Sequence, residues 1–153
     1  MPDYFMDTSA LVKNYVDEPG CHVVRDLLAN HRRGRVYVAA ITFVETVAAL
    51  CARERRADIT LPKRADLVVS LREDFAALTT CVVVTQDLLD EAAELASRQV
   101  LRGYDAVQLA GALVVQRVRA EEGGSRVILV SADAQLNVAA EAEGLEVLDP
   151  TDM

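Results

Sequence analysis

Short runs of apolar residues alternate along the chain with longer segments in which apolar residues recur every three or four positions. The short runs are rich in β-branched and large apolar residues, which favours β-strands. Their apolar character is continuous, and this predicts strands buried on both faces, as the strands of a parallel sheet are. We predict strands over residues 4–6, 36–40, 81–84, 127–130 and 145–148.

The longer segments have the apolar spacing near 3.6 residues that is typical of helices. We predict helices over residues 9–15, 21–31, 42–55, 63–78, 88–99, 105–121 and 134–143. Strands and helices therefore alternate along the chain, with two helices between the second and third strands and two between the third and fourth. This order predicts a single α/β domain spanning residues 1–153, built on a mainly parallel five-stranded sheet.

The composition is consistent with such a domain, and it also indicates the cellular compartment. Of the 153 residues, 52% are hydrophobic and 26% are charged, which is typical of a globular domain and not of a disordered chain. The three cysteines, Cys21, Cys51 and Cys81, are odd in number and far apart, so neither a disulfide framework nor a zinc site is indicated. The first residues show no signal-peptide pattern. We expect a cytoplasmic protein without membrane association.

Four acidic residues follow the predicted strands or begin the predicted helices. Asp7 directly follows the first strand, and Asp133 comes three residues after the fourth strand and begins the next helix. Glu45 lies in the first turn of the helix after the second strand. Because ligands bind outside the carboxyl ends of parallel strands, we expect these acids at one rim of the sheet. Asp105 begins a helix so apolar that it must be buried, and its charge there needs a partner.

Carboxylates gathered in this way need a cation. Like charges within about 4 Å repel one another by roughly 1 to 4 kcal/mol per pair, and local spacing ties no histidine, lysine or arginine to the four positions. A divalent cation removes the repulsion, and oxygen ligands favour hard ions such as Mg²⁺ or Mn²⁺. Such an ion lowers the pKa of a bound water and polarises a phosphoryl oxygen, as phosphodiester hydrolysis requires.

These residues therefore predict a metal-dependent nuclease. In this scheme Asp7, Asp105 and Asp133 hold the metal, directly or through water. Glu45 either completes the ligand set or orients the attacking water, and the sequence leaves both roles open.

Each acid taken alone also has a structural explanation. Thr42-x-x-Glu45 matches a capping box, in which each side chain satisfies a backbone N–H at the start of a helix. Asp105 and Asp133 are both placed to be N-caps. Four such coincidences at one rim are less probable than a single site, so we favour the site.

Three hydroxyl side chains lie beside these acids: Thr8, Ser9 and Ser131. Such residues are commonly caps or turn formers. As functional residues they would orient the neighbouring carboxylates or a metal-bound water. Because Thr8 and Ser9 are themselves able to cap the helix that follows them, Asp7 has the weakest structural explanation of the four acids.

The charge balance adds a constraint. The net charge is −8, which repels a nucleic-acid backbone unless the charge is segregated or bound cations neutralise part of it. Arg98 and Arg102 share a predicted helical face, four residues apart, just before Asp105. They belong either to a solvated helix surface or to a face that follows the substrate backbone.

Four motifs together resemble those of the PIN-domain ribonucleases, and most closely those of the VapC-like toxins of bacterial toxin-antitoxin pairs. The motifs occur in the family's order over essentially the whole chain, and their specificity lies in the combined set. They are Asp7-Thr8-Ser9-Ala10-Leu11-Val12-Lys13, Thr42-x-x-Glu45, Tyr104-Asp105-Ala106-x-x-Leu109-Ala110 and Ser131-Ala132-Asp133-x-x-Leu136.

The resemblance implies a three-layer fold, with a twisted, mainly parallel five-stranded sheet flanked by helices. It also implies dependence on Mg²⁺ or Mn²⁺, endonucleolytic cleavage of RNA, a homodimer, and inhibition by a cognate antitoxin protein. Asp7, Glu45, Asp105 and Asp133 take the positions of the family's acidic quartet. Its accessory hydroxyl positions fall on Thr8 or Ser9 and on Ser131.

Two other classes of protein are weighed against this one. A receiver-type regulatory domain also places acids at strand ends, but it needs a lone phosphoacceptor aspartate that ends a central strand. The second and third strands end in Ala40-Ile41 and Thr85-Gln86, with Asp87 as the only near candidate. A non-catalytic interaction module with a PIN-like fold has no need of all four acids.

Overall fold

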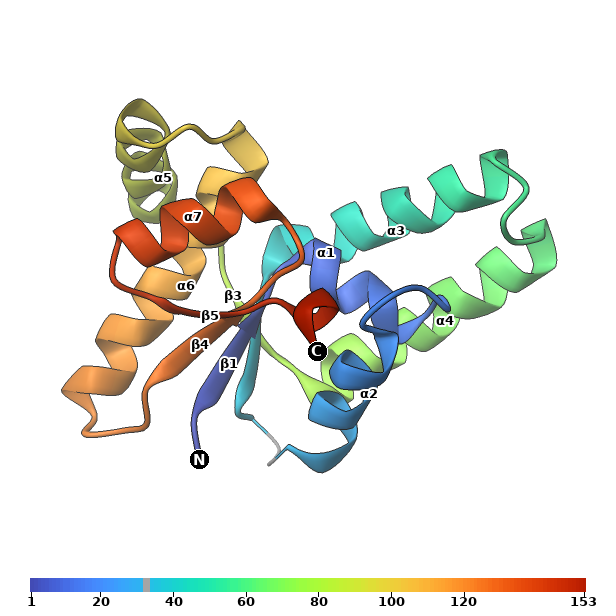
Figure 1. The fold of residues 1–153 in the computed structure, drawn as a ribbon, viewed down its shortest axis with the longest axis horizontal. Helices are drawn as coiled ribbons and strands as arrows, with labels where there is room; N and C mark the ends of the chain where they lie inside the picture. The colour runs from blue at the N-terminus through green and yellow to red at the C-terminus, as the bar shows by residue number, and fades with distance from the viewer. Residues whose placement is uncertain (32–33) are drawn as a thin grey trace.

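A five-stranded parallel sheet forms the centre of the protein in the computed structural model, which describes residues 1–31 and 34–153 (Figure 1). The strand order is β3-β2-β1-β4-β5, and every neighbouring pair is parallel. The strands are β1 (Asp3–Met6), β2 (Val36–Ala39), β3 (Thr80–Val82), β4 (Val127–Val130) and β5 (Glu146–Leu148). The order therefore reverses at β1, because the chain first extends the sheet through β2 and β3 and then returns to add β4 and β5 on the other side.

Helices connect the strands, and their positions confirm the predicted elements with ends that differ by no more than two residues. The first predicted helix is divided into a short α-helix and a 3-10 turn. The α-helices are α1 (Thr8–Leu11), α2 (Cys21–Asn30), α3 (Ala40–Arg55), α4 (Leu61–Leu78), α5 (Gln86–Arg98), α6 (Gly103–Glu121) and α7 (Ala134–Ala142), with 3-10 turns η1 (Val12–Asn14) and η2 (Pro150–Asp152).

Two hydrophobic cores lie on opposite faces of the sheet, because alternate residues of a strand point to opposite sides. Phe5 and Leu129 pack against α5, α6 and α7. Met6 and Val130 pack in the second core, with apolar residues of α1, α2, α3 and α4. Helices thus cover both faces and confirm the three-layer α/β fold. Figure 1 also shows α3 and α4 extending side by side away from the sheet.

Within the part of the chain that the structure describes, no helix combines the length and apolar character needed to cross a membrane.

Candidate active site

The carboxyl ends of β1 and β4 bring the first and last of the predicted site segments together. The two strands pair in parallel, with Met6 opposite Val130, so the residues that follow them leave the sheet side by side. Asp7 comes directly after β1, and its backbone N–H donates to the carbonyl oxygen of Val130 at 3.2 Å. Asp133 lies three residues after the end of β4. The expected rim therefore exists at the point where the strand order reverses.

Asp7 is the N-cap of α1, which corrects the expectation that Thr8 or Ser9 would take that role. Its Oδ1 accepts hydrogen bonds from the Ser9 hydroxyl at 2.7 Å and from the Ala10 N–H at 3.1 Å. The side chain is buried, and burial raises the pKa of Asp7 to about 7, although these hydrogen bonds act in the opposite direction. The nearby charge of Asp133 raises the pKa further. Asp7 is thus a buried carboxyl group that forms no ion pair with any lysine or arginine among residues 1–31 and 34–153.

Two serines connect the segment after β1 to the segment after β4. The hydroxyl oxygens of Ser9 and Ser131 lie 3.4 Å apart. Ser9 Oγ also accepts from the Ala132 N–H at 2.9 Å, and Ser131 Oγ accepts from the Asp133 N–H at 3.1 Å. These contacts hold the backbone that carries Asp133 against the backbone that carries Asp7.

Asp133 is the N-cap of α7, as its structural explanation predicted, and its Oδ1 accepts from the Leu136 N–H at 3.0 Å. Its second oxygen, Oδ2, lies 3.4 Å from Arg102 Nη2. Arg102 Nε also donates to Asp105 Oδ2 at 3.1 Å. One guanidinium therefore bridges two of the four acids, and the expectation that no arginine is tied to them is wrong.

The end of α5 and the start of α6 explain the remaining corrections, which concern Asp105 and the two arginines. Helix α6 begins at Gly103 and has Arg102 as its N-cap residue, so Asp105 is the third residue of the helix and not its cap. Helix α5 ends at Arg98. Arg98 and Arg102 consequently share no helical face, and Arg98 forms an ion pair with Glu143 instead.

Glu45 is held by an amide that sequence reasoning did not single out. Strand β2 runs directly into α3, which begins at Ala40, so Thr42 lies inside the helix and is fully buried. The capping-box interpretation of Thr42 and Glu45 is therefore wrong. Gln108 Nε2 donates to Glu45 Oε1 at 2.8 Å and to Thr42 Oγ1 at 2.9 Å, and it lies 3.4 Å from Thr8 Oγ1.

Gln108 had a signal in the sequence. It is the polar residue on an otherwise apolar stretch of α6, three positions after Asp105, and residues at this spacing share one helical face. Arg102 had a similar signal, because it precedes Asp105 by three positions. Neither spacing reveals that the partners of these side chains come from α3 and from the segment after β4.

The four acids line one rim without forming a closed ligand shell. Arg102 joins Asp105 to Asp133, the serine pair joins Asp7 to the Asp133 segment, and Gln108 joins Glu45 to α6. Over residues 1–31 and 34–153, no three His, Cys, Asp or Glu side chains converge closely enough to hold a metal ion.

The donor chemistry nevertheless fits a hard divalent cation. The acids supply only oxygen ligands, which suit Mg²⁺ or Mn²⁺. Burial, and to a lesser extent the charge of Asp133, raises the pKa of Asp7, and among residues 1–31 and 34–153 no cationic side chain offsets this effect. By contrast, the Asp105–Asp133 pair already carries a cation in the form of Arg102.

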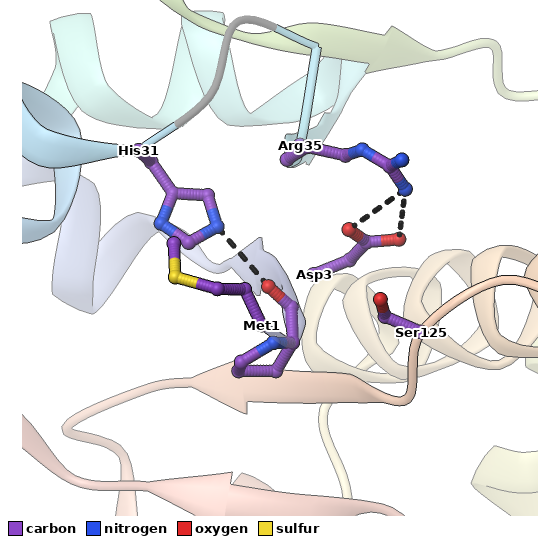
Figure 2. Close-up of a pocket in the computed structure, with 6 residues that line it drawn as sticks. Met1, Asp3, His31, Arg35 and Ser125 are labelled. Atoms are coloured by element: carbon purple, nitrogen blue, oxygen red, sulfur yellow. Dashed lines mark hydrogen bonds and ion pairs between the residues drawn. The ribbon is translucent and has the colours of Figure 1, made fainter.

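A separate cavity of about 190 Å³ lies at the opposite end of β1, and Figure 2 shows the side chains around it. Arg35 Nη1 donates to both oxygens of buried Asp3, at 3.2 and 3.3 Å, and Arg119 pairs with the same carboxylate. His31 Nε2 lies 3.1 Å from the carbonyl oxygen of Pro2. Because Asp3 is fully paired and lies at the amino end of its strand, we interpret this cluster as structural.

Comparisons with known proteins agree with the fold and extend over nearly the whole chain. The family model for the PIN domain matches residues 4–142. Ribonuclease VapC45 of Mycobacterium tuberculosis is 33% identical over 154 residues, an alignment that covers 98% of this chain and 100% of the relative.

Two solved structures share the fold at low sequence identity. The sarcin-ricin loop cleaving toxin VapC20 of Mycobacterium tuberculosis has a TM-score of 0.63 and 18% identity, and the match covers 94% of this chain and 96% of that one. A toxin-antitoxin complex from Klebsiella pneumoniae has a TM-score of 0.66 and 15% identity, with 97% and 98% covered.

Proposed function

The chain belongs to the PIN domain family, and on this premise we propose that it is a metal-dependent endoribonuclease and the toxin of a toxin-antitoxin pair. The observation that carries the proposal is the rim at the carboxyl ends of β1 and β4. There a buried carboxyl group, Asp7, which has no ion-pair partner in the part of the chain that the structure describes, lies beside two acids bridged by a guanidinium, Asp105 and Asp133. The name of VapC45, a ribonuclease 33% identical over its full length, supports the same activity.

Asp7, Asp105 and Asp133 would hold Mg²⁺ or Mn²⁺, directly or through water. When bound, such an ion lowers the pKa of a water and stabilises charge on a phosphodiester oxygen. Ser9 orients Asp7 through a 2.7 Å hydrogen bond, and Ser131 orients Asp133 through its backbone N–H. These two serines are the accessory hydroxyl groups of the proposed site.

Glu45 is assigned a different task from the other three acids. Gln108 already binds one of its oxygens, and Glu45 has its contacts within the network of Gln108 rather than with Asp7 or Arg102. We therefore assign Glu45 the orientation of the attacking water. Thr8 lies in the same network, at 3.4 Å from the Gln108 amide nitrogen.

The proposed partners follow from the substrate class and from the related structures. The protein acts on RNA in the cytoplasm, where its three free cysteines remain reduced. A cognate antitoxin protein inhibits it, as the Klebsiella pneumoniae toxin-antitoxin complex of the same fold supports. The active form is a homodimer. The PIN domain match argues against a receiver-type domain, and a non-catalytic module is the remaining alternative.

Substitution of the acids tests the function directly. Asp7→Asn and Asp105→Asn each remove a charge at nearly constant volume, and Asn is also a good N-cap residue at position 7. With Mn²⁺, each variant is expected to lose cleavage of a mixed RNA pool by on the order of a hundredfold or more, the effect of removing one charge-stabilising group from an active site.

Asp66→Asn is the matched control, because Asp66 is exposed on α4 and its replacement makes the same change in charge. Cleavage by this variant is expected to equal that of the wild type. The site assignment is wrong if either rim variant, folded by circular dichroism, cleaves RNA as fast as the control. A wild-type protein that leaves all RNAs intact with Mn²⁺, yet binds a partner peptide tightly, would favour the non-catalytic module.

A further inference from the structure

Arg102 is the side chain whose contacts the proposed function leaves without a role. Its guanidinium bridges Asp105 Oδ2, at 3.1 Å from Nε, and Asp133 Oδ2, at 3.4 Å from Nη2. We propose that Arg102 is an internal counter-ion that neutralises these two acids until a divalent cation displaces it, and that the displaced guanidinium then binds a phosphate group of the RNA substrate. This inference rests on the proposed function.

Competition for the same oxygen atoms is the first step of the argument. The guanidinium contacts the Oδ2 atoms of both acids, and a metal held between the acids needs at least one of these atoms. Two positive groups that share these ligands repel each other. The ion and the guanidinium therefore compete for the two acids, and binding of the ion favours release of Arg102.

The difference in exposure makes Arg102 the group that moves. Its side chain is 77% exposed, whereas those of Asp105 and Asp133 are 13% and 22% exposed. Asp133 is further fixed by its hydrogen bond from the Leu136 N–H. Arg102 can leave without opening the core, and the two acids remain in place to receive the ion.

The position of Arg102 in the chain keeps the released group near the reaction. It is the N-cap residue of α6, three positions before Asp105, so its guanidinium remains within one side-chain length of the rim. A guanidinium presents a planar pair of donors that matches a phosphate, and it stays charged at any physiological pH.

The net charge of the chain explains why a released Arg102 would help RNA to bind. An acidic protein of net charge −8 repels RNA, so a positive group beside the ion is needed to hold the backbone. Other arginines have partners away from the rim: Arg98 pairs with Glu143 and Arg117 pairs with Glu91. Metal binding does not free these residues, whereas it frees Arg102, because the partners of Arg102 are the proposed ligands.

A purely structural ion pair is the alternative explanation, in which Arg102 only fastens the start of α6. Arg102→Gln distinguishes the two, with Arg117→Gln as the matched control. Arg117 lies fifteen positions after Arg102, in the second half of α6 and about 22 Å away at the helical rise, and its substitution makes the same change in net charge.

The first measurement is calorimetric titration of Mn²⁺ into the proteins without RNA. Arg102→Gln is expected to bind Mn²⁺ about three- to tenfold more tightly than the wild type, because the ion no longer has to displace an exposed guanidinium from two acids. Arg117→Gln is expected to match the wild type. Equal affinities in the wild type and Arg102→Gln would overturn the counter-ion role.

The second measurement is binding of single-stranded RNA with Mn²⁺ at several salt concentrations, in the Glu45→Gln background, which is expected to prevent cleavage and keeps the three proposed metal ligands. Adding Arg102→Gln is expected to weaken binding about three- to tenfold and to lower the slope of log affinity against log salt by about 0.7, the loss of one phosphate contact. Arg102→Lys is expected to restore the slope, and Arg117→Gln to leave it unchanged.

The outcomes separate this inference from the function on which it rests. Tighter Mn²⁺ binding with unchanged RNA affinity and slope would overturn the substrate contact. If the wild type cleaves RNA with Mn²⁺ but Arg102→Gln behaves as the control does in both measurements, the nuclease stands and the role of Arg102 falls. If the wild type neither binds Mn²⁺ nor cleaves RNA, both are wrong.

Discussion

Gln108 shows at the scale of single residues how a buried amide positions an acid of the proposed site. It is only 2% exposed, and its Nε2 contacts three oxygen atoms, which belong to Glu45, Thr42 and Thr8. A buried polar atom that loses its partner costs about 1–3 kcal/mol. The amide therefore stabilises the fold and directs Glu45 at the same time, and the two effects need separate measurements.

Gln108→Leu is expected to lower both the stability and the rate of RNA cleavage, because it removes the donor to Glu45 at similar volume. The free energy of unfolding should fall by about 1–3 kcal/mol, and kcat should fall more than KM rises. Thr46→Val is the control. Thr46 lies in α3 and is buried as Gln108 is, but its hydroxyl donates to the Thr42 carbonyl oxygen and not to Glu45. The two variants are compared under conditions that give them the same loss of unfolding free energy. If Thr46→Val then loses as much activity as Gln108→Leu, the role of Gln108 is structural alone.

The raised pKa of Asp7 predicts how the stability of the metal-free protein depends on pH. The unfolded chain releases this proton near pH 3.8 and the folded protein near pH 7, so between these values the folded state binds more protons. The stability that Asp7 contributes is therefore complete below about pH 4 and is lost as the pH rises through 7.

Urea unfolding with a chelator checks this prediction. The wild type is expected to lose on the order of a few kcal/mol relative to Asp7→Asn between pH 4 and pH 7.5. Parallel stability curves for the two proteins would contradict a protonated, buried Asp7.

Helix α6 is the element that connects the core to the site. Its first turns carry Asp105 and Gln108 on one face, directly after Arg102, and Gly111 follows at the same spacing against β1. A Cβ atom at Gly111 would lie 2.9 Å from Phe5 Cζ, closer than real Cβ contacts. Gly111 therefore leaves room for the buried Phe5 ring of β1 to pack directly against α6.

Gly111→Ala is expected to force α6 away from β1 and to destabilise the protein by about 1–3 kcal/mol, the usual cost of overpacking a core. Gly103→Ala in the same helix is the control, because a Cβ at Gly103 has nothing within 4 Å. It is expected to be neutral or to stabilise by up to about 1 kcal/mol, since alanine is the better helix former. Denaturant midpoints compare the two, and equal midpoints would contradict the packing argument.

The arrangement of the whole molecule places the site between two independent cores. Strands β1 and β4 belong to both cores, and the carboxyl ends of these central strands carry Asp7 and Asp133. Asp7 and Asp133 therefore follow the most buried strands of the sheet. The protein as a whole carries a net charge of −8. A cation bound at this rim would therefore be expected to stabilise the whole fold.

Mn²⁺ is accordingly expected to raise the melting temperature. A ligand at about 100 times its Kd stabilises the native state by about 2.7 kcal/mol, which corresponds to roughly 5–10 °C for a domain of this size. Asp66→Asn should retain the full shift. A double variant, Asp7→Asn with Asp105→Asn, should lose most of it, and an undiminished shift in that variant would place the ion elsewhere.

The sequence by itself determined the order of the elements, the parallel sheet, and the delivery of Asp7 and Asp133 to one rim. These features follow from the local period of apolar residues and from a general rule for parallel sheets, so neighbouring positions contain enough information. The four motifs around Asp7, Glu45, Asp105 and Asp133 also indicated the family, which the PIN domain match confirms.

The tertiary structure decided which groups contact these acids. Arg102 reaches Asp133 across 31 positions, and Gln108 reaches Glu45 across 63. The early start of α3 at Ala40, which places Thr42 in the core, likewise depends on how the helix packs after β2. Such pairings arise from the distance between packed helices and strands, which local spacing does not contain. The residues of the rim were therefore predictable, whereas the arginine and the amide that complete it became visible only in the fold.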